Sequence, residues 1–395
     1  MEKKTVRTGI VGSGFSAAFH FEALQKVHGT NVEVIGVHSM DTEGGRAYAQ
    51  KREIRFFDSL DAILDEVDVI HVCVPPVAHE PISVAGLRRD KFVVCEKPLT
   101  GYFGDGSADF HWDRADMQTA LRTALASVER ILEAERNSQG RLLYAENWVY
   151  APTIQKEREI LEKTGGQILW MHGEESHSGS HSVDYAYSAR CGGGVLVGKG
   201  CHPLTAALYL KRVEGRVRDG KPIRPKTVSA RTHAVTRLEG FRDEGHIRCD
   251  YYDIDDFSVM HVEFTDGTIA DIIASDIVLG GIHNWLEVCA NNHRSLCSIN
   301  PNTTMQTYNP VEENFKDVYV VEKIGTKQGW ACTAPDEDWM TGYPQEAEAF
   351  YRTIAHGEPP ESDSLLAADS ISTIYSAYVS AQRQGAAVEV QTYPT

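Results

Sequence analysis

The sequence has 395 residues, of which 42% are hydrophobic and 24% are charged, the composition of a globular chain with two or three domains. The formal net charge of −17 argues against nucleic acids and anionic membranes as partners, because binding to phosphates needs clustered Lys and Arg. The sequence has no apolar run of about 18 residues and no early run like a signal-peptide core, so we expect no membrane partner. The eight cysteines form no CxxC pair, and reduced, mostly buried thiols fit a cytoplasmic protein.

The first predicted elements are a strand, a glycine-rich turn and a helix, in TVRTGIVGSGFSAAFHFEALQKV (5–27). Gly12, Gly14 and Ala17 have GxGxxA spacing. In that spacing the first glycine permits a tight turn, the second lets the backbone approach a pyrophosphate, and the small third residue keeps the helix close to the strand. The helix N-terminus then presents free N–H groups to the phosphates. Because a second strand follows, we predict a dinucleotide-binding turn here.

The end of that second strand, VEVIGV (32–37), normally selects the cofactor. An acid there would bind the ribose 2′-OH of NAD, whereas a small residue beside an Arg would favour NADP. The sequence continues instead with His38, Ser39 and Met40, and Arg46 lies further on. Neither pattern is complete, so the cofactor is NAD or NADP, and the lack of an Arg directly after Ser39 favours NAD.

Two further apolar strands are predicted in this region. One covers residues 69–74 and stops at Pro75, and the other lies in KFVVCEKPLT (91–100). Such strands, separated by helices, are typical of a parallel sheet with both faces covered. Their carboxyl ends lie on the edge that carries the glycine turn, where ligands of such sheets bind. The residues that we expect to project from this edge, beside the nicotinamide, are Glu96, Lys97 and Pro98.

The next stretch, GYFGDGSADFHWDRAD (101–116), precedes a predicted helix and is rich in glycines and aromatic residues. It suits a loop that covers the active site or reaches a neighbouring subunit, and a solvated insertion is the alternative. Later in the chain, alternating apolar residues over 257–275 predict a hairpin that turns at Asp266 and Gly267. Apolar residues at helical spacing predict helices over about 343–384.

The segment GEESHSGSHSVDY (173–185) is unusually polar. On a helix, His177 and His181 would resemble a pair of metal ligands. The glycine and serines between them favour a loop instead, and no further ligand spacing supports zinc, so we expect no metal. We expect this segment to leave a strand and to supply His181 and Tyr185 to a hydroxylated substrate.

Several of these motifs resemble those of the Gfo/Idh/MocA family (glucose–fructose oxidoreductase, inositol dehydrogenase and rhizopine catabolism). The motifs in the first third are the turn at 12–17, the strand end VCVPPVAH (72–79) and the tripeptide at 96–98. The similarity continues, in the same order, through AENWVYAP (145–152), CGGGVLVGKGCHP (191–203) and the C-terminal segment at 342–390.

The resemblance implies an α/β fold with two domains. Residues 1–145 would form a Rossmann domain, in which 101–116 is an extra loop, and residues 146–395 an α/β domain built on an open, mostly antiparallel sheet. Family precedent also implies a homodimer or homotetramer assembled through the exposed sheet face.

The resemblance further implies the residues of an active site. Lys97 and His202 match the family's acid/base groups. Beside the positive ring of the cofactor, the pKa of Lys97 is expected to fall. The residues expected to bind the cofactor are Gly12, Gly14, Phe15, Ser16, Ala17, Ser39, Pro75, His79, Glu96 and Pro98. The residues expected to contact the substrate are Asn147, Tyr150, His181 and Tyr185.

One position departs from the family pattern. Many members carry an Asp four residues before the active-site histidine, and this sequence has Gly198 there, followed by Lys199. Without that Asp, His202 is expected to lose its orienting carboxylate, so that proton transfer rests on Lys97 and His202 alone.

The leading functional prediction is therefore an NAD(P)-dependent oxidoreductase that acts on a secondary hydroxyl of a sugar, cyclitol or glycoside. Two alternatives remain open at this point. One is a glycosidase that uses bound NAD in a cycle of oxidation, elimination and reduction. The other is a cofactor-binding regulator without turnover.

Overall fold

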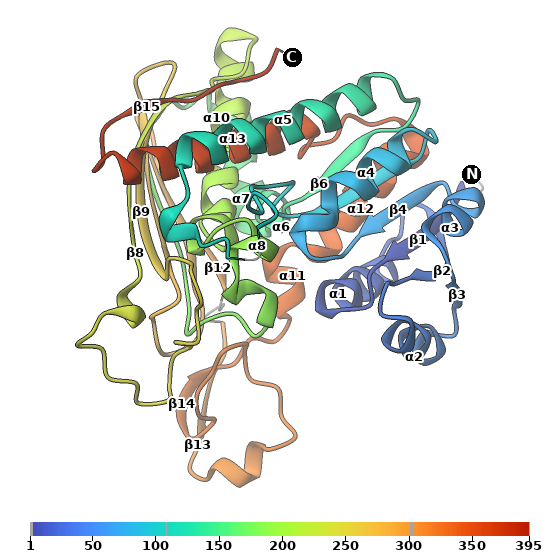
Figure 1. Cartoon of the computed structure of the whole chain (residues 1–395), viewed down its shortest axis with the longest axis horizontal. Helices are drawn as coiled ribbons and strands as arrows, with labels where there is room; N and C mark the ends of the chain where they lie inside the picture. Colours follow the sequence, from blue (N-terminus) through green and yellow to red (C-terminus); the bar gives the residue numbers. More distant parts are fainter. Residues whose placement is uncertain (1–2, 108, 301–303, 395) are drawn as a thin grey trace.

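The computed structural model describes residues 3–107, 109–300 and 304–394. Two β-sheets organise the chain, and Figure 1 shows the strands of the first on the right and those of the second on the left. The first sheet has six parallel strands in the order β3-β2-β1-β4-β5-β6. Its strands are β1 (Thr5–Val11), β2 (Asn31–His38), β3 (Arg55–Phe57), β4 (Val69–Val72), β5 (Phe92–Glu96) and β6 (Leu142–Ala145).

Helices connect these strands, which is why the apolar runs are continuous. The connecting helices are α1 (Phe15–Leu24), α2 (Thr42–Arg52), α3 (Leu60–Glu66), α4 (His79–Leu87) and α5 (Met117–Arg136). Every residue of β4 and of β6 is buried, as expected of strands with both faces covered. The predicted Rossmann-type parallel sheet is confirmed.

The second sheet has seven strands in the order β12-β11-β7-β10-β9-β8-β15. All neighbouring strands run antiparallel except β7 and β10, which are parallel. The predicted open, mostly antiparallel sheet is therefore confirmed. Its strands are β7 (Ile168–Ser176), β8 (Pro225–His233), β9 (Phe257–Phe264), β10 (Ile269–Ser275), β11 (His283–Ala290), β12 (Arg294–Asn300) and β15 (Val388–Glu389).

The hairpin of β9 and β10 forms as the alternating pattern predicts. Met260, Val262 and Phe264 point into the core and are buried, whereas the residues between them are partly or fully exposed. Gly267 closes the turn with a φ of +83°, a left-handed conformation that glycine adopts without steric cost.

The second half of the chain contributes most of the remaining helices. They are α6 (Asn147–Tyr150), α7 (Pro152–Thr164), α8 (Ser188–Cys191), α9 (Val195–Gly198), α10 (Cys201–Asp219), α11 (Glu337–Thr341), α12 (Tyr343–His356) and α13 (Ser364–Gln382). Helix α10 lies on one face of the second sheet. Helix α13 packs between α5 and β8, and α12 packs on α1, so both return to the first half of the chain (Figure 1). One hydrophobic core runs through both halves as a result.

Two irregular segments complete the fold. In the loop after β5, Tyr102 and Trp112 are buried, and the backbone N–H of Trp112 donates to Asp253 over 3.0 Å. This loop thus packs on its own chain, so the alternative of a solvated insertion is wrong for its aromatic residues. The strands β13 (Gln306–Asn309) and β14 (Gly329–Cys332) pair in a separate two-stranded arm at the bottom of Figure 1.

All eight cysteines are free, and five of them are buried. Among the helices of the described ranges, none combines the length and hydropathy that crossing a membrane requires.

Candidate active site

The glycine turn joins β1 to α1 at the carboxyl edge of the first sheet. Gly12 has a φ of +110°, and a Cβ at this position would lie 2.0 Å from the carbonyl oxygen of Cys73, so a side chain cannot be accommodated. A Cβ at Gly14 would meet no protein atom within 4 Å. Open space in front of Gly14 is what a dinucleotide needs in order to approach the backbone.

The N-terminus of α1 is free to bind an anion. It has no capping side chain and no acidic residue in its first turn, so its free N–H groups can bind phosphate oxygens. Phe15 is 69% exposed, Ser16 is partly buried beside it, and Ala17 is fully buried against the sheet. The arrangement of these predicted residues fits the pyrophosphate of NAD or NADP.

The end of β2 offers no free charged group to a ribose. Ser39 is buried, and Ser13 donates a hydrogen bond of 3.0 Å to it. Asp41 caps α2 by accepting from the N–H of Gly44, and Arg46 pairs with Asp58 over 2.8 Å on the surface.

The tripeptide 96–98 follows β5 on the same edge, and the peptide bond between Lys97 and Pro98 is cis. The carboxylate of Glu96 accepts from the backbone N–H of Lys97 and from His20, each over 3.0 Å. Burial favours a higher pKa for this carboxyl, but His20 and Lys97 hold the pKa of Glu96 below its ordinary value. Glu96 is therefore an ionised carboxylate beside Lys97.

Two residues of the neighbouring strand end were predicted to bind the cofactor. The side chain of His79 is buried, with Nδ1 2.7 Å from the carbonyl oxygen of Pro98 and Nε2 2.9 Å from that of Val74. Both ring nitrogens contact backbone carbonyl oxygens, so His79 joins the ends of β4 and β5, and its role towards the cofactor stays a prediction. Pro75 is exposed at the sheet edge.

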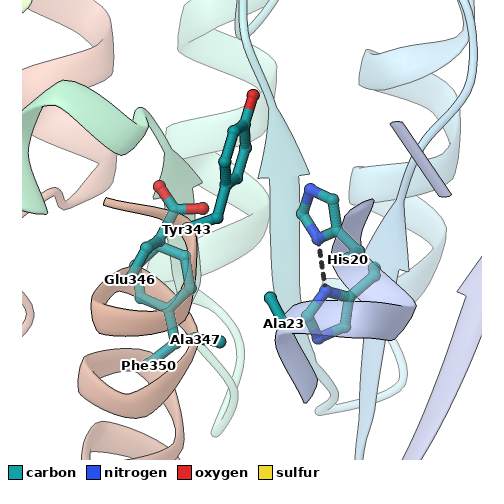
Figure 2. A pocket seen from close by; sticks show the side chains of 7 residues that line it. His20, Ala23, Tyr343, Glu346, Ala347 and Phe350 are labelled. Atoms are coloured by element: carbon teal, nitrogen blue, oxygen red, sulfur yellow. Dashed lines mark hydrogen bonds between the residues drawn. The ribbon is translucent and has the colours of Figure 1, made fainter. Parts of the chain in front are cut away.

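A chain of polar side chains continues behind Glu96 into the protein. His20 lies 2.7 Å from His71 between the Nδ1 atoms, and His71 lies 3.2 Å from the hydroxyl of Tyr351. Figure 2 shows Tyr343 and Glu346 of α12 facing His20 of α1 across a small cavity. Helix α12 therefore completes the support of the tripeptide from the far end of the sequence.

The ammonium group of Lys97 reaches towards the second half of the chain. It donates a 2.8 Å hydrogen bond to the carbonyl oxygen of Gly198 and lies 5.9 Å from the ring centre of Tyr185. Burial favours a lower pKa, but Tyr185, with Cys201, Glu175 and Glu96, raises the pKa of Lys97 well above its ordinary value. The groups of the protein itself therefore favour a charged Lys97, and the fall in pKa expected beside the positive ring of the cofactor stays a prediction.

His202 has an orienting carboxylate that the sequence analysis did not foresee. Glu146, which follows β6 and is fully buried, lies 2.5 Å from Nδ1 of His202 through Oε1. The ring of His202 also stacks on Trp148, 6.0 Å between ring centres. The prediction that His202 lacks such a carboxylate because position 198 is glycine is therefore wrong. With Nδ1–H donating to Glu146, Nε2 is left as the proton acceptor.

A second carboxylate faces the other nitrogen of the same ring. Oε2 of Glu175, at the end of β7, lies 3.8 Å from Nε2 of His202. That oxygen is buried and has no hydrogen-bond partner. Burial raises the pKa of Glu175, although His202, Lys97 and Lys199 oppose the rise. Glu175 was not predicted as a site residue, and its only local signal is an acid at the end of an apolar strand.

Glu146, Cys201 and His202 also bring possible metal ligands within 4.8 Å of one another. The 2.5 Å contact between Glu146 and His202 is a hydrogen-bond distance, shorter than the separation of about 3 Å between two ligand atoms of one tetrahedral zinc ion.

The polar segment after β7 forms a loop, as predicted. His177 is buried, and its Nδ1 accepts from the N–H of Gly179 over 2.9 Å. His181 is exposed, whereas Tyr185 lies in the site beside Lys97. Lys199 lies 2.5 Å from Asp276 and is almost fully buried.

Two further predicted substrate contacts are placed in structural roles. Tyr150 is 2% exposed and its hydroxyl lies 2.9 Å from that of Ser362. The side-chain amide of Asn147 donates to the carbonyl oxygen of Thr341 over 2.7 Å. Tyr150 packs in the core, and the predicted contacts of Tyr150 and Asn147 with a substrate stay predictions.

The arrangement can carry out proton transfer next to a dinucleotide. A charged ammonium, an oriented imidazole and a buried carboxyl gather where the two sheets meet. Such a set can hold a hydroxyl group, remove its proton and stabilise the developing negative charge.

Comparisons with known proteins agree with the fold. Residues 6–111 match the GFO_IDH_MocA family, described as an oxidoreductase family with an NAD-binding Rossmann fold. The glucose-6-phosphate 3-dehydrogenase of Bacillus subtilis (strain 168) is 27% identical over 93 residues, 24% of this chain and 26% of the relative. The inositol 2-dehydrogenase of Salmonella typhimurium (strain LT2) is 29% identical over 182 residues, 43% of this chain and 45% of the relative. These curated relatives are thus matched over about a quarter to a half of their length.

Among solved structures, the chain resembles GenD2 from gentamicin A biosynthesis in complex with NAD. The TM-score is 0.78 at 22% sequence identity, and the match covers 98% of this chain and 97% of that one. The two proteins share a fold over nearly their whole length.

Proposed function

The chain belongs to the Gfo/Idh/MocA oxidoreductase family, and we propose that it is a dehydrogenase that exchanges a hydride between NAD and a CH–OH group of a sugar, cyclitol or glycoside. The observation that carries this proposal is the contact of Lys97 with Gly198. It brings the ammonium group at the end of β5 beside the helix start that holds His202, four residues later.

In the oxidation direction, Nε2 of His202 takes the proton of the substrate hydroxyl. Glu146 keeps the Nδ1–H tautomer in place and stabilises the imidazolium that forms, as the carboxylate does in other acid–His pairs. The charged Lys97 donates a hydrogen bond to the same oxygen and stabilises its developing negative charge. The nicotinamide, when bound, supplies the acceptor for the hydride and its electron pair.

We propose NAD rather than NADP as the cofactor. A 2′-phosphate needs a nearby cation, and Arg46 already pairs with Asp58 at the surface. Ser39 is buried and bonded to Ser13. The NAD-binding description of the family and the NAD complex of the structural neighbour support the same choice.

We also propose a homodimer or homotetramer. The face of the second sheet opposite α10 carries half-buried side chains, among them His172, Asp271 and Trp285. Light scattering that finds a monomer over a range of concentrations would contradict this part of the proposal.

The test is a panel of sugars, inositols and glycosides with NAD and with NADP, monitored for nicotinamide reduction and separately for glycosidic bond cleavage. Reduction with NAD is the expected result. Cleavage without net reduction would favour a glycosidase with a redox cycle, and neither signal would favour a regulator.

Lys97→Ala should abolish turnover yet leave NADH binding, followed by fluorescence, nearly unchanged. Lys91→Ala is the matched control, because Lys91 stands just before the other end of β5 and is partly exposed. Turnover of Lys97→Ala at the rate of the unaltered chain would refute the assignment.

A further inference from the structure

The side chains of Glu175 and His202 face each other at a distance too long for a direct hydrogen bond. Oε2 of Glu175 and Nε2 of His202 are 3.8 Å apart, beyond the reach of a direct hydrogen bond. Because Nδ1–H of His202 is engaged by Glu146, Nε2 carries a lone pair in the neutral ring. An ionised carboxylate opposite it would also be an acceptor, so neither atom can donate a hydrogen bond to the other.

A buried acceptor without a donor costs about 1–3 kcal/mol, and buried polar atoms are nearly always paired. Oε2 of Glu175 is such an atom. A single hydroxyl group can lie within hydrogen-bonding distance of two atoms 3.8 Å apart, and a shared proton can alternate between them. A substrate hydroxyl that gives up its proton would therefore supply the donor that both atoms lack.

We propose that Glu175 is a third catalytic residue of the dehydrogenase reaction, the carboxylate on which the proton of the substrate hydroxyl finally resides. The inference rests on the function proposed above. In oxidation the C–H bond of the substrate carbon breaks and its electron pair leaves as the hydride for the nicotinamide, the electron pair of the O–H bond becomes the second bond of the carbonyl, and the proton passes to Nε2 of His202. It then moves to the Glu175 carboxylate, which becomes a neutral acid, and leaves for solvent after the product departs.

The groups around Glu175 suit this role. The charged groups that face it are His202 and Lys199 from the segment 199–202, Lys97 from the end of β5, Glu146 from the end of β6 and Glu322 from the segment before β14. Lys97 and Lys199 stabilise the ionised form, whereas burial and the two acids favour the protonated form. Burial raises the pKa of this carboxyl above its ordinary value, the direction that a proton acceptor beside an imidazole requires.

Glu175 also explains how the site operates with glycine at position 198. A Cβ at Gly198 would meet only the ring of Tyr185, at 3.4 Å, and the backbone there is not left-handed. A Cβ at this position is therefore accommodated, in the helical turn before His202 and beside Lys97. In this chain the carboxylate of Glu175 lies on β7, whereas a chain with Asp at position 198 would carry its carboxylate on α9.

The test removes the carboxylate at position 175 and then introduces one at position 198. Glu175→Gln, which keeps the shape and removes the acid, should lower kcat/KM for polyol oxidation by about 100-fold or more, with NADH binding unchanged. The acid limb of its pH profile should become less steep, because one titrating group is gone. The double variant Glu175→Gln with Gly198→Asp should recover part of the lost activity. Glu174→Gln, a partly exposed neighbour on the same strand, is the control and should behave as the unaltered chain.

An independent measurement needs no turnover. Infrared difference spectra of the cofactor-free protein, recorded as the pH is raised, should contain carbonyl bands of buried carboxylic acids, and Glu175→Gln should remove one of them while leaving the band that Asp255→Asn removes. Full activity and an unchanged pH profile in Glu175→Gln would overturn the role of Glu175 and leave the proposed function standing. An unaltered chain that oxidises nothing in the panel would overturn both.

Discussion

Replacing Glu146 by Gln tests the pairing at the centre of the site. The amide oxygen of Gln can still accept from Nδ1–H of His202, so the tautomer and the 2.5 Å contact survive. What is lost is the negative charge that stabilises the imidazolium once the proton has been taken. For unit charges about 4 Å apart at an effective dielectric of about 20, that interaction is about 4 kcal/mol. Since about 1.4 kcal/mol corresponds to a tenfold change in rate, kcat should fall about 1,000-fold.

The assay is steady-state polyol oxidation with NAD, together with a fluorescence titration of NADH that should be unchanged. The chain offers a matched control in Glu157, which is also fully buried and lies 2.7 Å from Nε2 of His293 on the far side of α7. Glu157→Gln should lower stability without changing kcat. A loss of less than about tenfold in Glu146→Gln would refute the reasoning, because it would mean that no imidazolium forms against this carboxylate.

Three further predictions follow from the fold. Gly14→Ala should keep the melting temperature but lose NADH binding, because its Cβ points into open space. Gly12→Ala should lower the melting temperature, because its Cβ would collide with the backbone of Cys73. Equal melting temperatures of the two variants in calorimetry would contradict this. His20→Phe removes a partner of the buried Glu96, so it should lower the free energy of unfolding by about 1–3 kcal/mol and raise KM for NAD; unchanged urea denaturation would contradict it. Burial raises the pKa of Asp255 to about 7, against about 3.9 in the unfolded chain. Its neutral form therefore stabilises the fold by at most about 4 kcal/mol below a pH of about 4, and this is lost as the pH rises through about 7; Asp255→Asn should remove that dependence in denaturation measured at several pH values.

Local pattern was sufficient to predict the first sheet and the β9–β10 hairpin. The glycine turn and the alternation at Met260 and Val262 depend on neighbours in the sequence, and these were found. The partners of His202 could not be found in this way. Glu146 and Glu175 lie 56 and 27 residues before it, at the ends of two strands that belong to different sheets, so no spacing rule connects them.

The pKa shift of Lys97 could not be predicted from the sequence for the same reason. The expected fall in the pKa of Lys97 considered burial and the cofactor, but Tyr185, Cys201 and Glu175, which raise this pKa, come from segments brought together only by folding. Tyr150 and His79 were assigned to the site from their motifs. Their polar atoms are bonded to Ser362 and to strand-end carbonyls, partners that a motif does not reveal.

The return of α12 and α13 to the first half of the chain has a consequence for biosynthesis. Tyr351 of α12 hydrogen-bonds Thr8 of β1, and the hydroxyl of Tyr375 in α13 accepts from the N–H of Tyr102, partners more than 270 positions apart. A nascent chain emerging from the ribosome therefore carries α1 and α5 with uncovered apolar faces until nearly all of it has been translated. Contacts this distant form slowly, and incompletely folded chains aggregate through such faces. Truncation before α12 should therefore yield a chaperone-dependent, insoluble product rather than a free-standing nucleotide-binding domain.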